Sequence, residues 1–417
     1  MKLLSRRHFF HFVATLTLSA LVAVGASAER TDPFYLYVTL GEEGHSEIGV
    51  HWHTMAKADA TVVHYDTESR GGDPEAYAHK GEGSSRQIDG LEDRRYIHGV
   101  MLTGLTPDTV YYFVVGDAAT GYSAENTFRT PPDVAPIRFI QGGDMHVLPS
   151  TRALTKLAGQ YDPAFCIVGG DIAYADGDLR RIRQWDAWFD IWTENMVTPD
   201  GHLIPMVQAI GNHEVNREES EDSHVRAPFY MNFFFTQGDK PYFVRRIGKL
   251  ISFIILDTGH LVPYEDQVDF LREQLEAHAD FPAVFPIYHV TFYPSARSFD
   301  DSRSVRGREH WKPLFEEHGI RVAFEHHDHT LKRTYPLLNG EIHPNGITYI
   351  GDGAFGVPTR EIIPNWYLEV AESIQHFWLA TVDEEQIHLV AIDADANFVD
   401  NVAITLEAAP REAAAAE

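Results

Sequence analysis

The chain has 417 residues and a formal net charge of −27, with 34 basic against 61 acidic side chains, and 44% of its residues are hydrophobic. This acidity argues against a protein that grips a nucleic-acid backbone, because phosphate contacts need a basic surface. The length predicts two domains with sizeable cores. The single cysteine, Cys166, excludes an intramolecular disulfide, and its apolar neighbours predict a buried thiol.

The first 28 residues have the features of an export signal. Arg6 and Arg7 lie in the segment SRRHFF, which matches the twin-arginine pattern, residues 12–24 are mainly apolar, and residues 26–28 (ASA) form a small-residue cleavage site. The apolar stretch is short for a membrane span, so we expect no span in the mature chain. We predict recognition by the twin-arginine export machinery and a periplasmic or extracellular location. A membrane anchor and a general secretory signal are the alternatives.

From residue 32 to residue 132 the chain alternates apolar and polar residues in short segments. Strands are expected over 47–52, 61–65 and 109–115, with glycine-rich stretches between them. Tyr111 follows a turn, so these 100 or so residues resemble a fibronectin type III sandwich with its tyrosine corner. The region also has histidines without ligand-like clustering, which we expect to be packed or solvated: His45, His51, His53, His64 and His98.

A different pattern covers residues 136–406. Short apolar runs predict buried strands at 137–140, 165–168, 205–210, 251–256, 284–288 and 322–324, with further strands at 348–350 and 386–390. Apolar residues at three- and four-residue spacing predict helices over 180–194 and 265–278. Residues 407–417 are expected to be a disordered tail. The predicted fold class is therefore α/β (α+β), with an all-β domain ahead of an α/β domain.

Polar side chains directly follow five of these predicted strands. They are Asp144 and His146; Asp171 and Tyr174; Asn212, His213 and Glu214; His289; and His326, His327, Asp328 and His329. Because residues beyond the carboxyl ends of strands in an α/β sheet converge on one crevice, we expect these side chains to meet. So many buried polar groups need partners, and divalent or trivalent cations suit carboxylate, amide and imidazole ligands. The sequence therefore predicts a metal site at this edge.

The order G-D, G-D-x-x-Y, G-N-H-E, H and H-x-H resembles that of the calcineurin-like metallophosphoesterases, and the tyrosine makes the chain similar to a purple acid phosphatase. The likeness covers nearly the whole mature chain and implies a metallophosphoesterase α/β sandwich domain over 136–406. It also implies two metal ions, a ferric iron and a divalent metal (Zn, Fe or Mn), which Asp171 bridges. The implied ligands are Asp144, Asp171, Tyr174 and His329 for iron, and Asp171, Asn212, His289 and His327 for the divalent metal.

The resemblance implies a reaction as well. Two adjacent cations would clamp a phosphate while a metal-bound hydroxide attacks it in line, which places the bridging Asp171 in the catalytic centre. Asn212 and His213 would contact the substrate, with His213 orienting the phosphate or protonating the leaving alcohol. Glu214 is expected to orient His213 or to cap the following turn.

We expect a small phosphorylated substrate, namely a phosphate monoester. A phosphodiesterase or nucleotide pyrophosphatase is the enzymatic alternative. A catalytically dead exported binding protein is the alternative of another class, and it predicts vacated ligand positions, whereas all seven implied positions are filled here.

Departures from the family pattern leave several roles open. His146 stands where the purple enzymes usually have glycine, and it gives the Asp-x-His with which other metallophosphoesterases bind the first metal. It is either a ligand or a residue behind the ligands or beside the substrate. His326 replaces the glycine of G-H-x-H, and either covers the site or contacts phosphate. In place of the histidine pair of the plant enzymes the chain has Arg303, Arg306 and Arg308, each of which either binds phosphate or lies on the surface.

Overall fold

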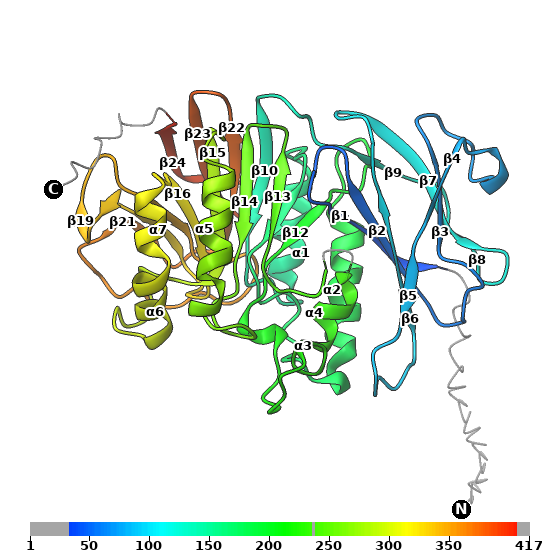
Figure 1. Cartoon of the computed structure of the whole chain (residues 1–417), viewed down its shortest axis with the longest axis horizontal. Helices are drawn as coiled ribbons and strands as arrows, with labels where there is room; N and C mark the ends of the chain where they lie inside the picture. The colour runs from blue at the N-terminus through cyan, green and yellow to red at the C-terminus, as the bar shows by residue number, and fades with distance from the viewer. Residues whose placement is uncertain (1–32, 236–237, 407–417) are drawn as a thin grey trace, which may run out of the picture.

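The computed structural model describes residues 33–235 and 238–406. The predicted export signal at 1–28 and the predicted disordered tail at 407–417 lie outside these ranges. Two large sheets pack face to face, helices cover their outer faces, and a β domain formed by the N-terminal residues lies at one end (Figure 1). The predicted fold class, α/β with an N-terminal β domain, is confirmed.

The first large sheet joins the two predicted domains. Within the described ranges its ten strands follow the order β24 (Phe398–Thr405), β23 (Gln386–Asp393), β22 (His376–Val382), β10 (Ile137–Gly142), β11 (Cys166–Val168), β12 (Met206–Gln208), β1 (Phe34–Leu40), β2 (Ile48–Thr54), β6 (Tyr96–Leu102) and β5 (Ser84–Arg86). The central strands β10, β11, β12 and β1 are parallel, with Thr39 of β1 paired to Met206 of β12. The N-terminal β domain therefore continues the sheet of the second domain.

A smaller sheet completes the N-terminal β domain. It contains β4 (His79–Glu82), β3 (Val62–Asp66), β7 (Val110–Asp117), β8 (Gly121–Tyr122) and β9 (Asn126–Arg129). The Tyr111 hydroxyl accepts a hydrogen bond from the Thr106 amide at 2.9 Å, the contact expected of a tyrosine corner. The wider likeness to a fibronectin type III domain stays a prediction.

The five histidines that were expected to be packed or solvated are buried or half-buried in the N-terminal β domain. His51, His53 and His98 are fully buried. The ring of His98 lies between the hydroxyls of Thr54 and Thr61, at 2.9 and 3.0 Å. These contacts satisfy both ring nitrogens and give this histidine a structural role.

The second large sheet has seven strands within the described residues. Their order is β13 (Phe243–Ile247), β14 (Ile251–Ile255), β15 (Ala283–Val290), β16 (Val322–His326), β20 (Thr348–Gly351), β17 (Leu331–Thr334) and β21 (Leu368–Glu372), and the hairpin β18 (Leu337–Leu338) and β19 (Glu341–Ile342) lies apart. Strands β14, β15, β16 and β20 are parallel. Phenylalanines from both sheets fill the space between them: Phe139 and Phe253 meet edge to face with ring centroids 5.2 Å apart.

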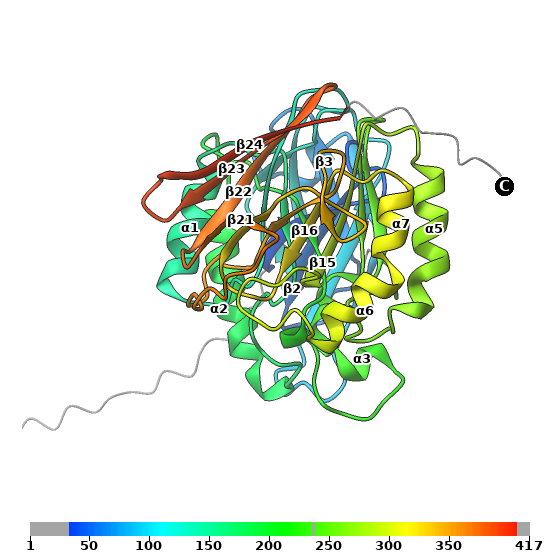
Figure 2. The same cartoon turned by 90° about the vertical axis from the view of Figure 1, so that its left-hand side faces the viewer.

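Helices cover the outer face of each sheet. The helices of the described residues are α1 (Pro149–Gly159), α2 (Ile182–Asn195), α3 (Ser223–Arg226), α4 (Pro228–Phe233), α5 (Val268–Ala277), α6 (Ser302–His310) and α7 (Lys312–Glu317). Figure 2 shows α1 and α2 on one side of the sheets and α5 and α7 on the other. The two predicted helices are found as α2 and α5, each preceded by a 3-10 turn, η2 (Leu179–Arg181) and η5 (Glu265–Gln267). In the described part of the chain, no helix combines the length and apolar character needed to cross a membrane.

Candidate metal centre

The predicted ligands meet where the carboxyl ends of the parallel strands of both sheets come together. Strands β10, β11 and β12 lie in the first sheet and β15 and β16 in the second, so both sheets of the predicted α/β sandwich contribute residues. Several of the loops turn back abruptly, so that non-glycine residues adopt left-handed backbone conformations: Asp144 (φ 56°), Asp171 (51°), Tyr174 (60°), His327 (81°) and His329 (61°). Such conformations cost free energy in a folded protein and are typical of functional sites.

The first group of side chains contains Asp144, Asp171 and His329, whose ligand atoms all lie within 4.8 Å of one another. The Tyr174 hydroxyl joins them, because it lies 3.2 Å from Asp144 Oδ1 and 3.2 Å from His329 Nε2. His329 Nε2 is 3.0 Å from Asp144 Oδ1. The four residues predicted to hold the first metal therefore face one point.

The second group contains Asp171, His289 and His327, again with ligand atoms within 4.8 Å. His289 Nε2 lies 3.2 Å from Asp171 Oδ2 and 3.2 Å from His327 Nδ1. Asp171 belongs to both groups, which is the position a bridging carboxylate needs. The fourth predicted ligand, Asn212, has a buried side-chain oxygen that accepts no hydrogen bond from any described residue.

His146 belongs to neither group among the described residues. Its Nδ1 accepts a hydrogen bond from the Val147 amide at 2.7 Å. Its ring packs against that of Tyr174 with centroids 4.7 Å apart, and the ring of His213 lies 4.1 Å from the same tyrosine. The two imidazoles contact Tyr174 and restrain its phenol, while ligation by His146 stays a prediction.

Backbone carbonyls orient two of the imidazoles. His289 Nδ1 lies 2.9 Å from the carbonyl oxygen of Gly169, and His329 Nδ1 lies 3.3 Å from that of Pro358. An Nδ1–H that donates to a carbonyl leaves the Nε2 lone pair facing the site, as in metal-binding histidines. Gly353 completes the enclosure, because a Cβ there would lie 1.9 Å from Asp144 Oδ2.

Glu214 joins the loops that carry the ligands and does not orient His213. Its carboxylate accepts hydrogen bonds from the amides of Asp171 at 2.7 Å and Ile172 at 2.8 Å. It also accepts from the Gly211 amide at 2.8 Å, which caps the 3-10 turn η3 (Asn212–Glu214). Neither of the two roles expected for Glu214, orienting His213 or capping the following turn, is observed, because the turn that it caps is the one that it ends.

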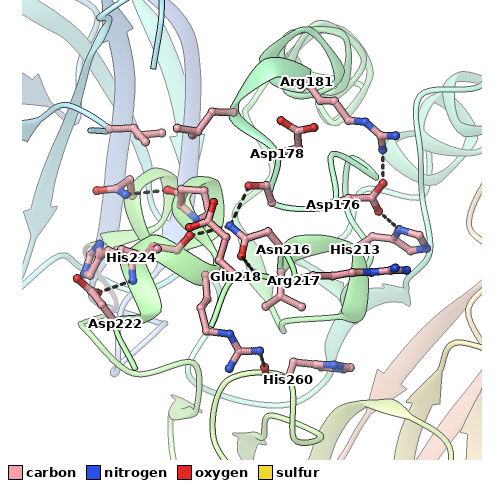
Figure 3. Close-up of a pocket in the computed structure, with 18 of the residues that line it drawn as sticks. Asp176, Asp178, Arg181, His213, Asn216, Arg217, Glu218, Asp222, His224 and His260 are labelled. Carbon is pink, nitrogen blue, oxygen red and sulfur yellow. Dashed lines mark hydrogen bonds and ion pairs between the residues drawn. The ribbon is translucent and has the colours of Figure 1, made fainter. Parts of the chain in front are cut away.

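Asp176 orients the ring of His213. Its carboxylate forms a short hydrogen bond with His213 Nδ1, and Arg181 pairs with the same carboxylate (Figure 3). His213 Nε2 then lies 3.9 Å from Asp171 Oδ2, at the edge of the site. The carboxylate that controls this ring is thus 37 residues away in the sequence and not the adjacent Glu214.

The carboxylates create a strongly negative site. Burial, and then the charges of Asp144 and Asp171, raise the pKa of Tyr174 far above its usual value. Burial opposes a charge on His289, yet the neighbouring Asp171 and Asp144 outweigh it and raise its pKa to about 9. Burial, followed by the charge of Asp171, raises the pKa of Glu214 to about 7. A phenol ionises in such surroundings only when a cation supplies positive charge.

These residues fit a pair of cations. Two Asp and His groups share one carboxylate, and the amide oxygen of Asn212 is buried without a donor. Carboxylate and phenol oxygens dominate the first group, as a hard trivalent ion requires, whereas imidazoles and an amide form the second. The donor set therefore supports a dinuclear centre.

His326 lies behind the site and does not face a substrate. It is fully buried, and its Nδ1 is 2.8 Å from the carbonyl oxygen of Tyr288. A Cβ at Gly169 would lie 1.9 Å from the His326 ring, so this loop passes directly over the imidazole. Burial lowers the pKa of His326 to about 4. Of the two roles left open, covering the site is the correct one.

The three arginines of the following segment have different surroundings. Arg306 is exposed and pairs with Glu265 at 2.5 Å. Arg308 lies 3.7 Å above the ring of Phe299 and donates to its carbonyl oxygen at 2.6 Å, which is a structural role. Only Arg303 among them lines the large cavity beside the metal centre.

Residues after β14 were missed by the sequence analysis. Asp257 follows this strand, is fully buried, and accepts hydrogen bonds from the amides of His260, Leu261 and Val262 at 2.7–2.8 Å. The ring of His260 lies 5.8 Å from that of His289. Asp257 and His260 follow the predicted strand 251–256, so the expectation that residues beyond strand ends converge on the site would have identified both.

A cavity of about 1460 Å³ opens beside the metal centre. Asn212, His213 and His260 line it on the side of the centre, and residues 86–89 of the N-terminal β domain also line it. Figure 3 shows His213 and His260 among the lining side chains. Both parts of the chain therefore contribute to the space next to the predicted reacting groups.

Comparisons with known proteins agree with this architecture. A family model described as the N-terminal domain of purple acid phosphatases matches residues 33–130. Purple acid phosphatase 23 of Arabidopsis thaliana is 26% identical over 296 residues, which cover 62% of each chain. Phosphoenolpyruvate phosphatase of Allium cepa is 26% identical over 331 residues, covering 74% of this chain and 64% of that protein. The chain thus spans less than two thirds of the length of these two relatives.

A solved structure has the same fold. The purple acid phosphatase from yellow lupin (Lupinus luteus) seeds superposes with a TM-score of 0.75 at 20% identity, covering 90% of this chain and 74% of that one. The chain therefore has the fold of this metallophosphoesterase, with paired Asp and His groups that suit two cations. The N-terminal family model and the relatives make it similar to a purple acid phosphatase-type metallophosphoesterase. The recognition made from the sequence is confirmed.

Proposed function

We propose that this chain is a dinuclear metallohydrolase that cleaves phosphate monoesters. The observation that carries the proposal is the pair of Asp and His groups that share Asp171 beside the unpartnered oxygen of Asn212. The names of the two curated relatives describe them as phosphatases, and phosphoenolpyruvate, in the name of the Allium cepa protein, is a phosphate monoester.

The two bound cations would supply an activated water and neutralise charge on the phosphate during in-line displacement. The chain's own residues position the reactants. Asp171 belongs to both groups of ligands and so fixes their relative position. Glu214 accepts hydrogen bonds from the loops that carry Asp171 and Asn212 and holds them together. His213, held through Nδ1 by Asp176, turns Nε2 toward the site. In its protonated form Nε2 can donate to a phosphate oxygen or to the leaving alcohol.

For the metals, we propose a ferric ion with Asp144, Asp171, Tyr174 and His329 and a divalent ion, Zn, Fe or Mn, with Asp171, Asn212, His289 and His327. The proposal is supported by three atoms that lie within 3.2 Å of one another, namely Asp144 Oδ1, the Tyr174 hydroxyl oxygen and His329 Nε2. The resemblance implies a visible charge-transfer band from a ferric phenolate. Tyr174→Phe should abolish this band, and its persistence would show that another residue supplies the colour.

The activity is tested with purified protein whose metal content is measured by elemental analysis. Phosphate release from p-nitrophenyl phosphate should exceed release of nitrophenol from bis(p-nitrophenyl) phosphate by at least about tenfold, because a monoester leaves more oxygens for the two cations. Asp171→Asn should abolish turnover. A preference for the diester would favour a phosphodiesterase, and two bound metals without any turnover would favour a binding protein.

We also propose export by the twin-arginine route, on the basis of Arg6 and Arg7 alone. A reporter fused to residues 1–32 should leave the cytoplasm of a host that has this machinery. The double variant Arg6→Lys, Arg7→Lys should retain the reporter inside the cell. Unchanged export of the double variant would favour a general secretory signal.

A further inference from the structure

The cavity beside the metal centre is larger than the predicted reaction requires. Its volume of about 1460 Å³ exceeds the 300–1,000 Å³ of most small-molecule sites. Asn212 and His213 line it, so a phosphate held at the metal centre would direct its leaving group into this space. The lining residues of the cavity therefore determine which leaving groups bind well.

Arginines are concentrated in this cavity although the chain carries a charge of −27. Those that line it are Arg86, Arg180, Arg181, Arg217, Arg226 and Arg303. Arg180 and Arg181 are neutralised, because they pair with Asp178 and Asp176. The other four form no ion pair with any residue in the described ranges. Asp239 lies close enough to Arg86, and Asp257 to Arg303, for their charges to interact, but neither carboxylate forms an ion pair with these arginines.

Three of these arginines come from different segments near the metal centre. Arg217 lies in the loop after η3, four residues beyond His213, and Figure 3 shows both side chains at the cavity. Arg226 ends α3 and donates to the carbonyl oxygen of His260 at 2.7 Å. Arg303 lies in the first turn of α6. A guanidinium binds phosphate or carboxylate through two parallel hydrogen bonds, so the three together suit an anion.

Three carboxylates outside these pairs also line the cavity, namely Asp89, Glu218 and Asp222, so the four unpaired arginines exceed them by one charge. Asp222 caps α3, where it accepts from the His224 amide at 2.8 Å. Asp89 and Glu218 are exposed, as Arg217 is, so water and salt screen all three. Arg86 extends over the ring of Phe235 at 3.9 Å, which holds its guanidinium at the cavity wall.

We propose that the cavity binds a second anionic group of the substrate, and that Arg217 and Arg303 recognise it. The substrate class is then a phosphate monoester whose leaving alcohol carries another phosphate or a carboxylate. This inference rests on the proposed function of the same centre. It goes further because it assigns specificity to arginines outside the metal ligands, and it explains why an acidic protein keeps unpaired arginines in one place.

The test compares propane-1,3-diol bisphosphate with the corresponding monophosphate, whose leaving groups differ only in the second anion. For the wild-type protein loaded with metal, kcat/KM should be at least about tenfold higher for the bisphosphate, beyond the factor of two for its equivalent ends. Arg303→Ala and Arg217→Ala should each reduce this ratio by about fivefold to tenfold. Arg303→Lys should keep part of it, since the charge remains.

Arg306→Ala is the matched control, because Arg306 lies on the same helix but pairs with Glu265 outside the cavity. Its ratio should equal that of the wild type. Equal kcat/KM values for the two compounds, or a preference unaffected by both arginine variants, would overturn the anion subsite while leaving phosphatase activity intact. Absence of phosphate release from either compound would overturn the subsite and the proposed function together. Arg217 is exposed, so its variant tests the idea even if Arg303→Ala fails to fold.

Discussion

Glu214 should be among the most costly residues of the site to replace, although it is not a predicted metal ligand. It is 2% exposed and accepts hydrogen bonds from the amides of Asp171, Ile172 and Gly211. Glu214→Ala leaves three buried N–H groups without an acceptor. At about 1–2 kcal/mol for each group, the free energy of unfolding should fall by about 3–6 kcal/mol.

Glu214→Gln separates the hydrogen bonds from the bulk of the side chain. One carboxylate oxygen accepts from both Asp171 and Gly211, and the other accepts from Ile172. A glutamine whose oxygen takes the place of the carboxylate oxygen near Asp171 and Gly211 keeps those two hydrogen bonds, but its amino group then faces the Ile172 amide, which is also a donor. Glu214→Gln should therefore lower the free energy of unfolding by about 1–3 kcal/mol. Because the same bonds hold the loops of Asp171 and Asn212, both variants should bind less metal.

The assay is urea unfolding followed by tryptophan fluorescence, on protein treated with a chelator so that metal binding does not contribute to stability. Glu218→Ala is the control, because Glu218 lies on the exposed loop that follows and should change stability by less than about 0.5 kcal/mol. The reasoning is refuted if Glu214→Ala costs less than about 1 kcal/mol or no more than the control.

Three further outcomes are expected. Gly353→Ala should leave fewer than two metals per chain by elemental analysis, because the added Cβ would lie 1.9 Å from the carboxylate oxygen of a predicted ligand, Asp144. The control is Gly340→Ala, which also has a positive φ but would place its Cβ with no atom within 4 Å, and it should keep both metals. Asp176→Asn should lower kcat about 10- to 100-fold with less effect on KM, because it holds the ring of His213; equal changes in both constants would contradict this role. Burial lowers the pKa of His98 to about 4. Between pH 6.5 and pH 4 the unfolded chain therefore binds a proton at His98 that the folded chain does not bind. The free energy of unfolding decreases as the pH is lowered through this range. His98→Gln should lessen that fall by up to about 3 kcal/mol, and an unchanged pH profile in acid unfolding would show that His98 does not titrate this way.

Local sequence patterns were sufficient for much of the second domain. The run 251–256 is almost entirely apolar because its strand lies between the other sheet and a layer of helices, and it was found as β14; the run 137–140, apolar except for the exposed Arg138, was found as β10. Helix α2 was predicted from its apolar spacing. Helix α6 was not expected, because its sequence, SRSVRGREH, is almost entirely polar.

The N-terminal boundary shows a limit of such patterns. Apolar alternation gave the strands of the β domain, but strand partners depend on packing between segments distant in sequence. Thr39 of β1 pairs with Met206 of β12, so the sheet runs through the predicted boundary between the domains. No periodicity near residue 39 could indicate a partner that far along the chain.

The sequence by itself determined which residues follow the strands and in what order, because a strand, its end and the next polar residue are adjacent in the chain. It thereby gave the candidate ligands Asp144, Asp171, Asn212, His289 and His327. Only the tertiary structure decided how the side chains face one another. It placed the predicted ligands where the carboxyl ends of strands from two sheets come together. It also buried His326 behind the site and formed the hydrogen bond between His213 and Asp176. These contacts join segments tens to hundreds of residues apart, and packing of the sheets, not local sequence, brings them within hydrogen-bonding distance.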